Sequence, residues 1–181
     1  MSTDERGVLR KERVYPHARE LVWAALTNGE ALAQWLMPND FKPELGCEFC
    51  FHVDPMPMLP GNVVRCKVLV FEPTERMVWS WRMVSTKPGK SLPEQEIEWV
   101  LKPHEGGGTR LIFTQRGAAA MPWLYRLMMS MGWGTMMKRW LPTVMGAFER
   151  GGDGGYIYRR LSKAPNRGHH GVKTVPEGYF K

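Results

Sequence analysis

The sequence has little of what disulfide-rich or membrane-spanning proteins contain. Only 3 of its 181 residues are cysteines, and its first residues, MSTDERGVLRKER, lack the apolar core of a secretory signal. No run of about 18 uncharged apolar residues occurs, because charges interrupt even the most apolar stretch, 121–148. We therefore expect reduced thiols, no transmembrane helix and a cytoplasmic location.

The few cysteines are also poorly spaced for a metal or redox site. Cys47, Cys50 and His52 fall in CEFCFH, an alternating stretch that is typical of a β-strand. Residues three apart on a strand point to opposite faces of its sheet. We expect Cys47 to face the interior with Cys66 of the next strand, and Cys50 and His52 to face solvent. Thiols arranged in this way cannot converge on one ion, so we predict no metal and no cofactor.

Acid–base and nucleophilic groups are scarce on the faces that we expect to be internal. Gln115 and Tyr125 are the polar side chains found there, and they do not complete a catalytic constellation. The acidic ladder within 94–98 is expected on the outer face, ion-paired across strands to Arg110 and Arg116. We predict no catalytic residue and favour a non-enzymatic protein. A cyclase-type enzyme that uses the interior as a shaping chamber is an alternative.

The positive charge is concentrated at the C-terminus. The net charge is +7, and residues 151–181 hold six Lys and Arg against two acidic residues. This tail is rich in Gly and Pro, and its stretch YIYRRLSK mixes aromatic with basic residues. Such a mixture would suit RNA or an anionic membrane surface, but we expect a solvated tail, with transient contact to an anionic membrane as the alternative. The rest of the chain is only weakly basic, so nucleic acid is not an expected partner.

What the sequence does contain is a series of stretches with period two. GVLRKERVY reads as a first strand, and alternation then recurs in GCEFCFHV, NVVRCKVLVF, RMVWSWRM, EQEIEWVLK and GTRLIFTQRG. Turn-forming residues separate these stretches. Each has one bulky face and one solvated face, which indicates an antiparallel sheet covered on one side.

Helical spacing appears in three places. Two short helices are expected after the first strand, in ARELVWAALT and EALAQWLM. The third runs from Trp133 to Phe148 with apolar residues at i, i+3 and i+4, and Pro142 should kink it. We expect this last helix to cover the sheet. The preceding segment, 118–131, is apolar around most of a helical circumference and is predicted to be a lid, a dimer contact or an interfacial helix.

Local motifs carry a resemblance to a known family. RVYPHARELVWAALTNGEALAQWL resembles the opening of bacterial proteins of the activator of Hsp90 ATPase homologue family, in the START/Bet v 1-like (SRPBCC) superfamily. GCEFCF, FEPTERMVWSW, GGGTRLIFTQRG and GWGTMMKRW are similar to later motifs of that family. The resemblance covers about residues 8–150. It implies an α+β helix-grip fold, in which a curved antiparallel sheet wraps around a long C-terminal helix. Residues 1–7 would be a flexible N-terminus, and 151–181 the basic tail.

This fold implies a cavity between the sheet and the C-terminal helix. The bulky inward residues are expected to line it: Trp35, Phe49, Phe51, Trp79, Trp81, Trp99, Phe113, Gln115, Met137 and Trp140. We therefore predict binding of an apolar or aromatic small molecule, by a carrier, sensor or binding protein. The alternative is a co-chaperone-like interaction module, with a protein partner or a second copy bound through 118–131.

Overall fold

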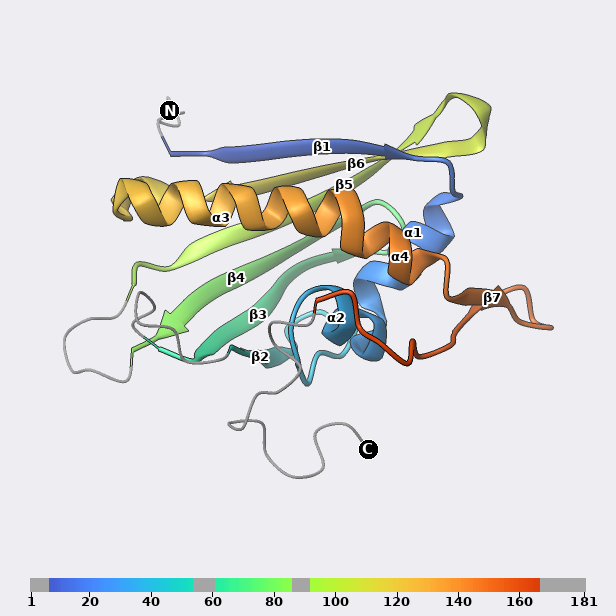
Figure 1. Cartoon of the computed structure of the whole chain (residues 1–181), viewed down its shortest axis with the longest axis horizontal. Coiled ribbons are helices and arrows are strands. Elements are labelled where there is room, and N and C mark those ends of the chain that lie inside the picture. Colours follow the sequence, from blue (N-terminus) through green and yellow to red (C-terminus); the bar gives the residue numbers. More distant parts are fainter. Residues whose placement is uncertain (1–6, 54–60, 86–91, 167–181) are drawn as a thin grey trace.

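One antiparallel sheet of six strands forms the body of the molecule (Figure 1). The computed structural model describes residues 7–53, 61–85 and 92–166. The strands are β1 (Leu9–Tyr15), β2 (Glu48–His52), β3 (Val63–Glu72), β4 (Arg76–Val84), β5 (Gln95–His104) and β6 (Gly108–Arg116). Their order, β1-β6-β5-β4-β3-β2, makes neighbours of every consecutive pair from β2 to β6 and places the first strand beside the last. The predicted meander is confirmed.

Two short helices connect β1 to β2. The first is α1 (Arg19–Thr27) and the second is α2 (Gly29–Trp35). The Asn28 side chain caps α2, since its Oδ1 accepts a hydrogen bond of 2.9 Å from the Ala31 backbone N–H. The Trp35 indole then donates to the Ala25 carbonyl oxygen at 3.0 Å, which holds the two helices together.

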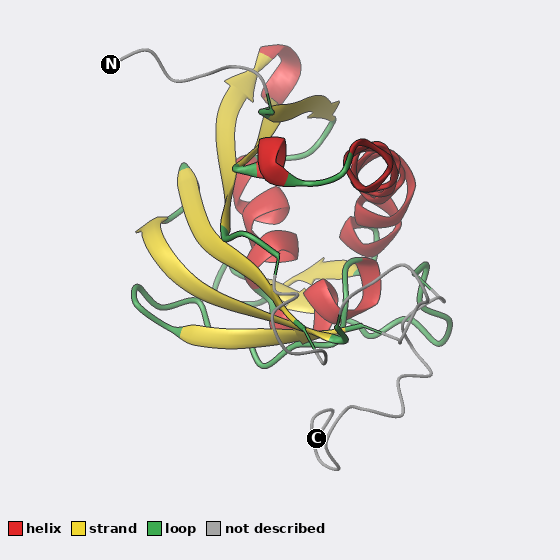
Figure 2. Ribbon diagram, turned by 90° about the vertical axis from the view of Figure 1, so that its left-hand side faces the viewer, coloured by secondary structure: helices red, strands yellow, loops and turns green. Residues whose placement is uncertain are grey.

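The sheet curves around a single long helical segment, residues 123–145 (Figure 2). It comprises α3 (Trp123–Thr135), a π turn η3 (Met136–Trp140) and α4 (Leu141–Met145). The irregular turn ends two residues before Pro142, which has no N–H to continue the regular hydrogen-bond ladder. Tyr15 anchors the segment, because its hydroxyl donates to the Met137 carbonyl oxygen at 2.6 Å. The helix-grip fold is confirmed.

The structure differs from the sequence-based prediction at the segment 118–131. Residues 118–120 form a short 3₁₀ turn, η2 (Ala118–Ala120), and residues from 123 onward belong to the same helix that covers the sheet. The segment is therefore not a separate element. Among the described residues, no helix combines the length and the apolar character needed to cross a bilayer.

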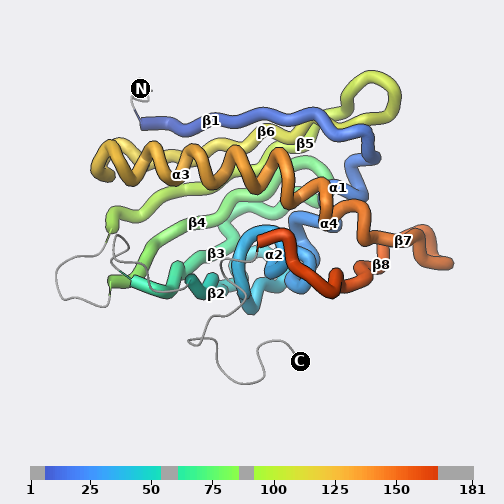
Figure 3. Tube along the Cα trace, viewed as in Figure 1, coloured from blue at the N-terminus to red at the C-terminus, as the bar shows by residue number. Residues whose placement is uncertain are grey.

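The first part of the C-terminal tail packs on the domain (Figure 3). Strands β7 (Phe148–Arg150) and β8 (Tyr156–Tyr158) pair across the boundary that we placed after residue 150. Gln34 of α2 then binds the tail, since its Nε2 donates to the Leu161 carbonyl oxygen at 2.9 Å and its Oε1 accepts from the Leu161 N–H at 3.0 Å. The predicted N-terminal segment before residue 7 and the tail beyond residue 166 lie outside the described residues.

Candidate ligand-binding cavities

Most of the predicted site residues pack against one another. Six of them, together with Phe41, which was not predicted, form what we call the aromatic cluster: Trp35, Phe41, Phe49, Phe51, Trp79, Trp99 and Phe113. Adjacent rings lie with their centroids 4.8–6.0 Å apart, mostly tilted or edge to face. All are buried, and Trp35, Trp79 and Trp99 are fully so. The cluster therefore fills the interior that it surrounds.

Two described cavities lie elsewhere, and they include only two of the ten predicted residues. Trp81 lines one cavity and Gln115 lines the other. The predicted residues of the aromatic cluster line neither cavity, and Met137 is fully buried in the core. Trp140 is half-buried and packs on the core from the helix. The structure assigns these residues to packing, and a role for them in binding stays a prediction.

The first cavity lies between α3 and the concave face of the sheet. We call it the methionine cavity, because six of its lining side chains are methionines. Its volume is about 140 Å³. The lining consists of Leu36, Met37, Val53, Val64, Trp81, Met83, Leu92, Gln95, Met121, Tyr125, Met128, Met129, Gly132, Trp133 and Met136. Flexible thioethers adapt to ligands of varied shape, so this lining suits an apolar guest.

Trp133 forms the wall between the methionine cavity and the aromatic cluster. Its ring centroid lies 5.8 Å from that of Trp81, which also lines the cavity, and 5.7 Å from that of Trp99. Its indole N–H donates to Gln115 Oε1 at 3.0 Å, which fixes the ring. A molecule in the cavity would therefore touch Trp81 and Trp133, and both rings can report its presence.

Two polar side chains face this apolar space. Gln95 Oε1 accepts a hydrogen bond from Gln115 Nε2, which leaves the Gln95 amide nitrogen as a donor. The Tyr125 hydroxyl contacts only a thioether sulfur among the described residues, Met83 Sδ at 3.8 Å. Burial raises the pKa of Tyr125 to about 12, so the hydroxyl stays protonated and can donate. The cavity thus offers donors to a ligand that has an acceptor.

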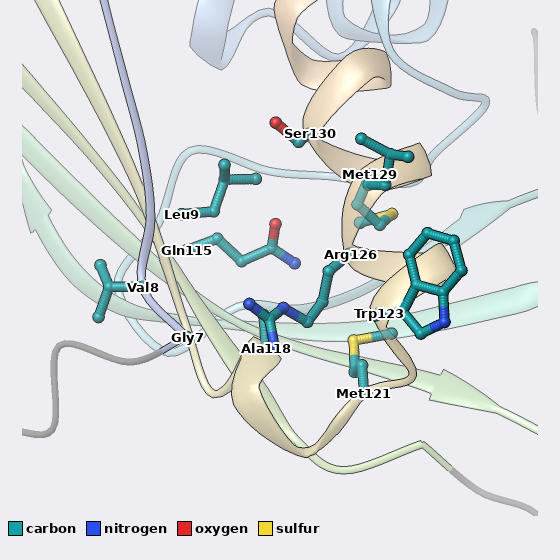
Figure 4. A pocket seen from close by; sticks show the side chains of 11 residues that line it. Gly7, Val8, Leu9, Gln115, Ala118, Met121, Trp123, Arg126, Met129 and Ser130 are labelled. Carbon is teal, nitrogen blue, oxygen red and sulfur yellow. The ribbon is translucent and has the colours of Figure 1, made fainter.

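The second cavity lies on the other side of α3, against β1 (Figure 4). We call it the β1–α3 cavity. It measures about 330 Å³ and is lined by Gly7, Val8, Leu9, Gln115, Ala118, Met121, Trp123, Arg126, Leu127, Met129 and Ser130. Met121 and Met129 also line the methionine cavity. The N-terminal half of α3 therefore has open space on both sides.

Cys50, Cys66 and His52 lie on strands as predicted, but Cys47 directly precedes β2 and is only partly buried against the core. Cys66 is buried opposite Phe49, and burial raises the pKa of its thiol, which disfavours the reactive thiolate. Cys50 is half-buried, and its backbone N–H donates to Asp40 Oδ1 at 2.7 Å. His52 does not face open solvent, because it is only 8% exposed, and burial lowers its pKa. No group of three or more metal-ligating side chains occurs among the described residues.

The acidic ladder is only partly paired as predicted. Glu98 binds Arg116 at 2.6 Å and also Arg76 at 2.8 Å, on the outer face of the sheet. The predicted pairing of Arg110 with the ladder is wrong, because Arg110 binds Glu12 of β1 at 3.3 Å. The strand register explains this, because Arg110 lies opposite Lys102 on β5, whereas Glu98 lies opposite Thr114, four residues further along β6.

Several cavity residues escaped the sequence analysis. Gln95 and Met83 lie on inward faces, but polar and flexible side chains did not stand out among the tryptophans. Gly132 and Gly134 were the missed signal on the helix, since two glycines within three residues are unfavourable there unless space or packing requires them. Arg126 was noted only as an interruption of an apolar stretch.

Comparison with known proteins agrees with this architecture. The family model of activator of Hsp90 ATPase homolog 1-like proteins matches residues 16–146. Protein MLL2253 from Mesorhizobium loti is 28% identical over 72% of this chain and 91% of its own, with a TM-score of 0.60. CV1439 from Chromobacterium violaceum is 23% identical over 77% of this chain and 96% of its own, with a TM-score of 0.58.

The AHSA1 protein of Silicibacter pomeroyi is 20% identical, over 75% of this chain and 96% of its own, with a TM-score of 0.58. Identities of 20% and 23% show the shared fold alone. No curated protein matches the chain. The family model nevertheless covers well over half of the sequence and runs from the end of β1 to the residue after α4. The chain therefore belongs to the family of activator of Hsp90 ATPase homolog 1-like proteins.

Proposed function

We propose that this protein binds an apolar or aromatic small molecule in the methionine cavity and acts as a cytoplasmic carrier, sensor or binding protein. The fold, which is that of a ligand-binding domain family, supports the proposal. The observation that carries it is the apolar cavity beneath α3, with its six methionines and its two hydrogen-bond donors. These features suit an apolar molecule with one acceptor.

The size of the cavity limits the ligand, or the part of it that enters. A closed apolar cavity of roughly 150 Å³ is known to bind a benzene-sized molecule. The methionine cavity, at about 140 Å³, would thus hold one aromatic ring or a short branched chain. A longer ligand would extend past Met121 and Met129 toward the β1–α3 cavity, because both cavities share these two side chains.

Gly132 offers a direct test. A Cβ built on this residue would meet no atom within 4 Å, and the residue lines the methionine cavity. Gly132→Leu should therefore fill the cavity without displacing its neighbours. We expect iodobenzene, a heavy-atom quencher, to reduce the tryptophan fluorescence of the wild type saturably, through contact with Trp81 and Trp133. The leucine should weaken this binding at least tenfold.

Gly134→Leu is the matched control. Gly134 lies on the same helix but lines neither cavity, and a Cβ there would make an ordinary contact of 3.7 Å with Lys11 Nζ. Both substitutions stabilise the helix by a similar amount, about 0.5–1 kcal/mol. The control should bind iodobenzene like the wild type. Saturable quenching that is equal in Gly132→Leu and the wild type would contradict the proposal.

A second candidate function is protein interaction through the outer side of α3. Four apolar side chains of α3 are exposed: Trp123 at 71%, Leu124 at 44%, Leu127 at 50% and Met131 at 66%. Two of them, Trp123 and Leu127, also border the β1–α3 cavity. Exposed apolar patches of this kind often mark contact surfaces. The two candidates are separable, because Gly132→Leu fills the inner side of the helix and leaves the outer side unchanged. Self-association that survives this substitution, measured by sedimentation equilibrium, would favour a role of the outer side.

A further inference from the structure

We propose that the β1–α3 cavity binds a small carboxylic acid with an apolar body, whose carboxylate pairs with Arg126, while Lys11 of β1 places a second cation further along α3. This inference concerns a different cavity from the proposed function and does not require the methionine cavity to be occupied.

Arg126 lines this cavity and has no acidic partner among the described residues. Its side chain extends from α3 toward the side of the cavity formed by Gln115 and Ala118 (Figure 4). In the part of the chain that the structure describes, the Arg126 side chain makes no ion pair and no hydrogen bond. A guanidinium offers two parallel N–H donors to a carboxylate, which is the geometry of the strongest charge-assisted pairs. The group is exposed, so holding it ready for an anion costs little desolvation.

Lys11 is a second cation on the same groove. It follows Leu9 on one face of β1, and Leu9 lines the cavity. The Lys11 ammonium reaches α3, because its Nζ lies 3.7 Å from where a Cβ of Gly134 would stand. Gly134 is one helical turn beyond Ser130, another lining residue. Lys11 thus lies beside the cavity, without forming part of its lining.

Neutralising carboxylates are directed elsewhere. Among the described residues, no acidic side chain lines the β1–α3 cavity. The nearest acid on β1, Glu12, points to the opposite face of the strand and pairs with Arg110 at 3.3 Å and with Arg10 at 3.9 Å. Among the described residues, Lys11 and Arg126 therefore give the groove a positive charge that these surface pairs do not cancel. An anion would supply the missing charge.

The remaining lining requires an apolar body behind that anion. Val8, Leu9, Met121, Leu127 and Met129 provide most of the surface. The Gln115 amide keeps one N–H after its bond to Gln95, which suits a further acceptor. At about 330 Å³ the cavity lies at the lower end of the range for small-molecule sites, roughly 300–1,000 Å³. It therefore suits a medium-chain or single-ring acid and leaves no room for a large headgroup.

The test compares decanoate with 1-decanol, which has the same chain without the charge, by isothermal titration calorimetry below the micelle concentration. Wild type should bind decanoate about tenfold more tightly than decanol, in keeping with one exposed charge-assisted pair. Arg126→Gln should remove this preference by weakening decanoate binding while decanol binding stays within about twofold. Arg126→Lys should restore part of it, because the charge returns without the paired donors.

Arg139→Gln removes an equal charge from an exposed position of the same helical segment, outside both cavities, and should keep the preference. Equal affinity of wild type for decanoate and decanol, or equal losses in Arg126→Gln and Arg139→Gln, would overturn the proposal. Tighter binding of decyl phosphate than of decanoate would overturn the carboxylate assignment. Saturable iodobenzene quenching should persist in Arg126→Gln, so this proposal and the methionine-cavity proposal can fail independently.

Discussion

Two different sets of side chains cover the concave face of the sheet beneath the helical segment. In the aromatic cluster, rings from α2, β2, β4, β5 and β6 contact one another and leave neither described cavity among them. Beneath α3 the lining changes to methionines, and two cavities flank the helix. The sheet is continuous through both regions, so the difference comes from the side chains and from the helix above them.

The aromatic cluster should be the rigid part of this molecule, and the lining of the methionine cavity the adaptable part. Tryptophan and phenylalanine have few rotatable bonds and pack in defined mutual orientations, so the aromatic cluster should hold the fold in place. Methionine has three rotatable bonds and adapts its shape, so the cavity lining should accommodate a guest. Trp133 belongs to both regions, because it contacts Trp99 and Phe113 on one side and lines the methionine cavity on the other.

The largest expected effect comes from Trp99, at the centre of the aromatic cluster. Its ring contacts those of Trp35, Trp79, Phe113 and Trp133, and it is fully buried. Trp99→Ala should lower the free energy of unfolding by about 3–5 kcal/mol, because it leaves a large void among rigid neighbours. Urea unfolding followed by far-UV circular dichroism measures this loss.

Met128→Ala is the matched substitution in the methionine cavity. Met128 is half-buried and lines the methionine cavity. Truncation of its side chain enlarges a cavity that already exists. We therefore expect the free energy of unfolding to fall by about 1 kcal/mol or less. If both alanine variants lost similar stability, the distinction between a packed and an open region would be wrong.

A smaller effect is expected on the outer face, behind the aromatic cluster. Burial of the Glu98 carboxyl raises its pKa, but hydrogen bonds from Arg116 and Arg76 outweigh this and hold the pKa below its usual value. Both arginine side chains are more than 40% exposed, so solvent screens their interaction. Glu98→Gln should therefore cost only about 1–2 kcal/mol at neutral pH. Glu96→Gln is the control, since Glu96 makes no ion pair with the described residues, and it should cost less.

The effect of Glu98→Gln on stability should also depend on pH. A carboxyl whose pKa is lowered by folding contributes its full stability above the ordinary glutamate pKa of about 4.3. That contribution is lost as the pH falls through the lowered pKa of the folded state. The difference in stability between wild type and Glu98→Gln should thus shrink on acidification in this range. A difference that stayed constant from pH 7 to about pH 3 would show that the carboxylate charge does not contribute.

The fold could be predicted from the sequence, because both helical spacing and strand alternation indicate which residues face inward. Phe49 and Phe51 were expected on the inner face and lie there, and Pro142 marked an irregularity of the helix that the structure places in the preceding π turn. Family motifs between residues 8 and 150 agreed with this reading, and the family model matches 16–146.

The location of the open space could not be obtained in the same way. Alternation shows which side chains point inward, but it does not show how far the helix stands from the sheet at each point. Trp79 and Trp81 are equivalent by pattern, yet of the two only Trp81 lines one of the two described cavities. Segment 118–131 was ambiguous for a related reason. Part of the surface of α3 borders the cavities while another part exposes Leu124 and Met131, so its apolar residues surround the helix.

The most direct test of the account is a crystal structure of the protein soaked with iodobenzene, whose iodine can be located by anomalous scattering. We predict an iodine position in the methionine cavity beneath α3, between Trp81 and Trp133, with the rings of the aromatic cluster unmoved. An iodine located among Phe49, Trp79 and Trp99, or a well-diffracting soaked crystal with no site beneath α3, would contradict it.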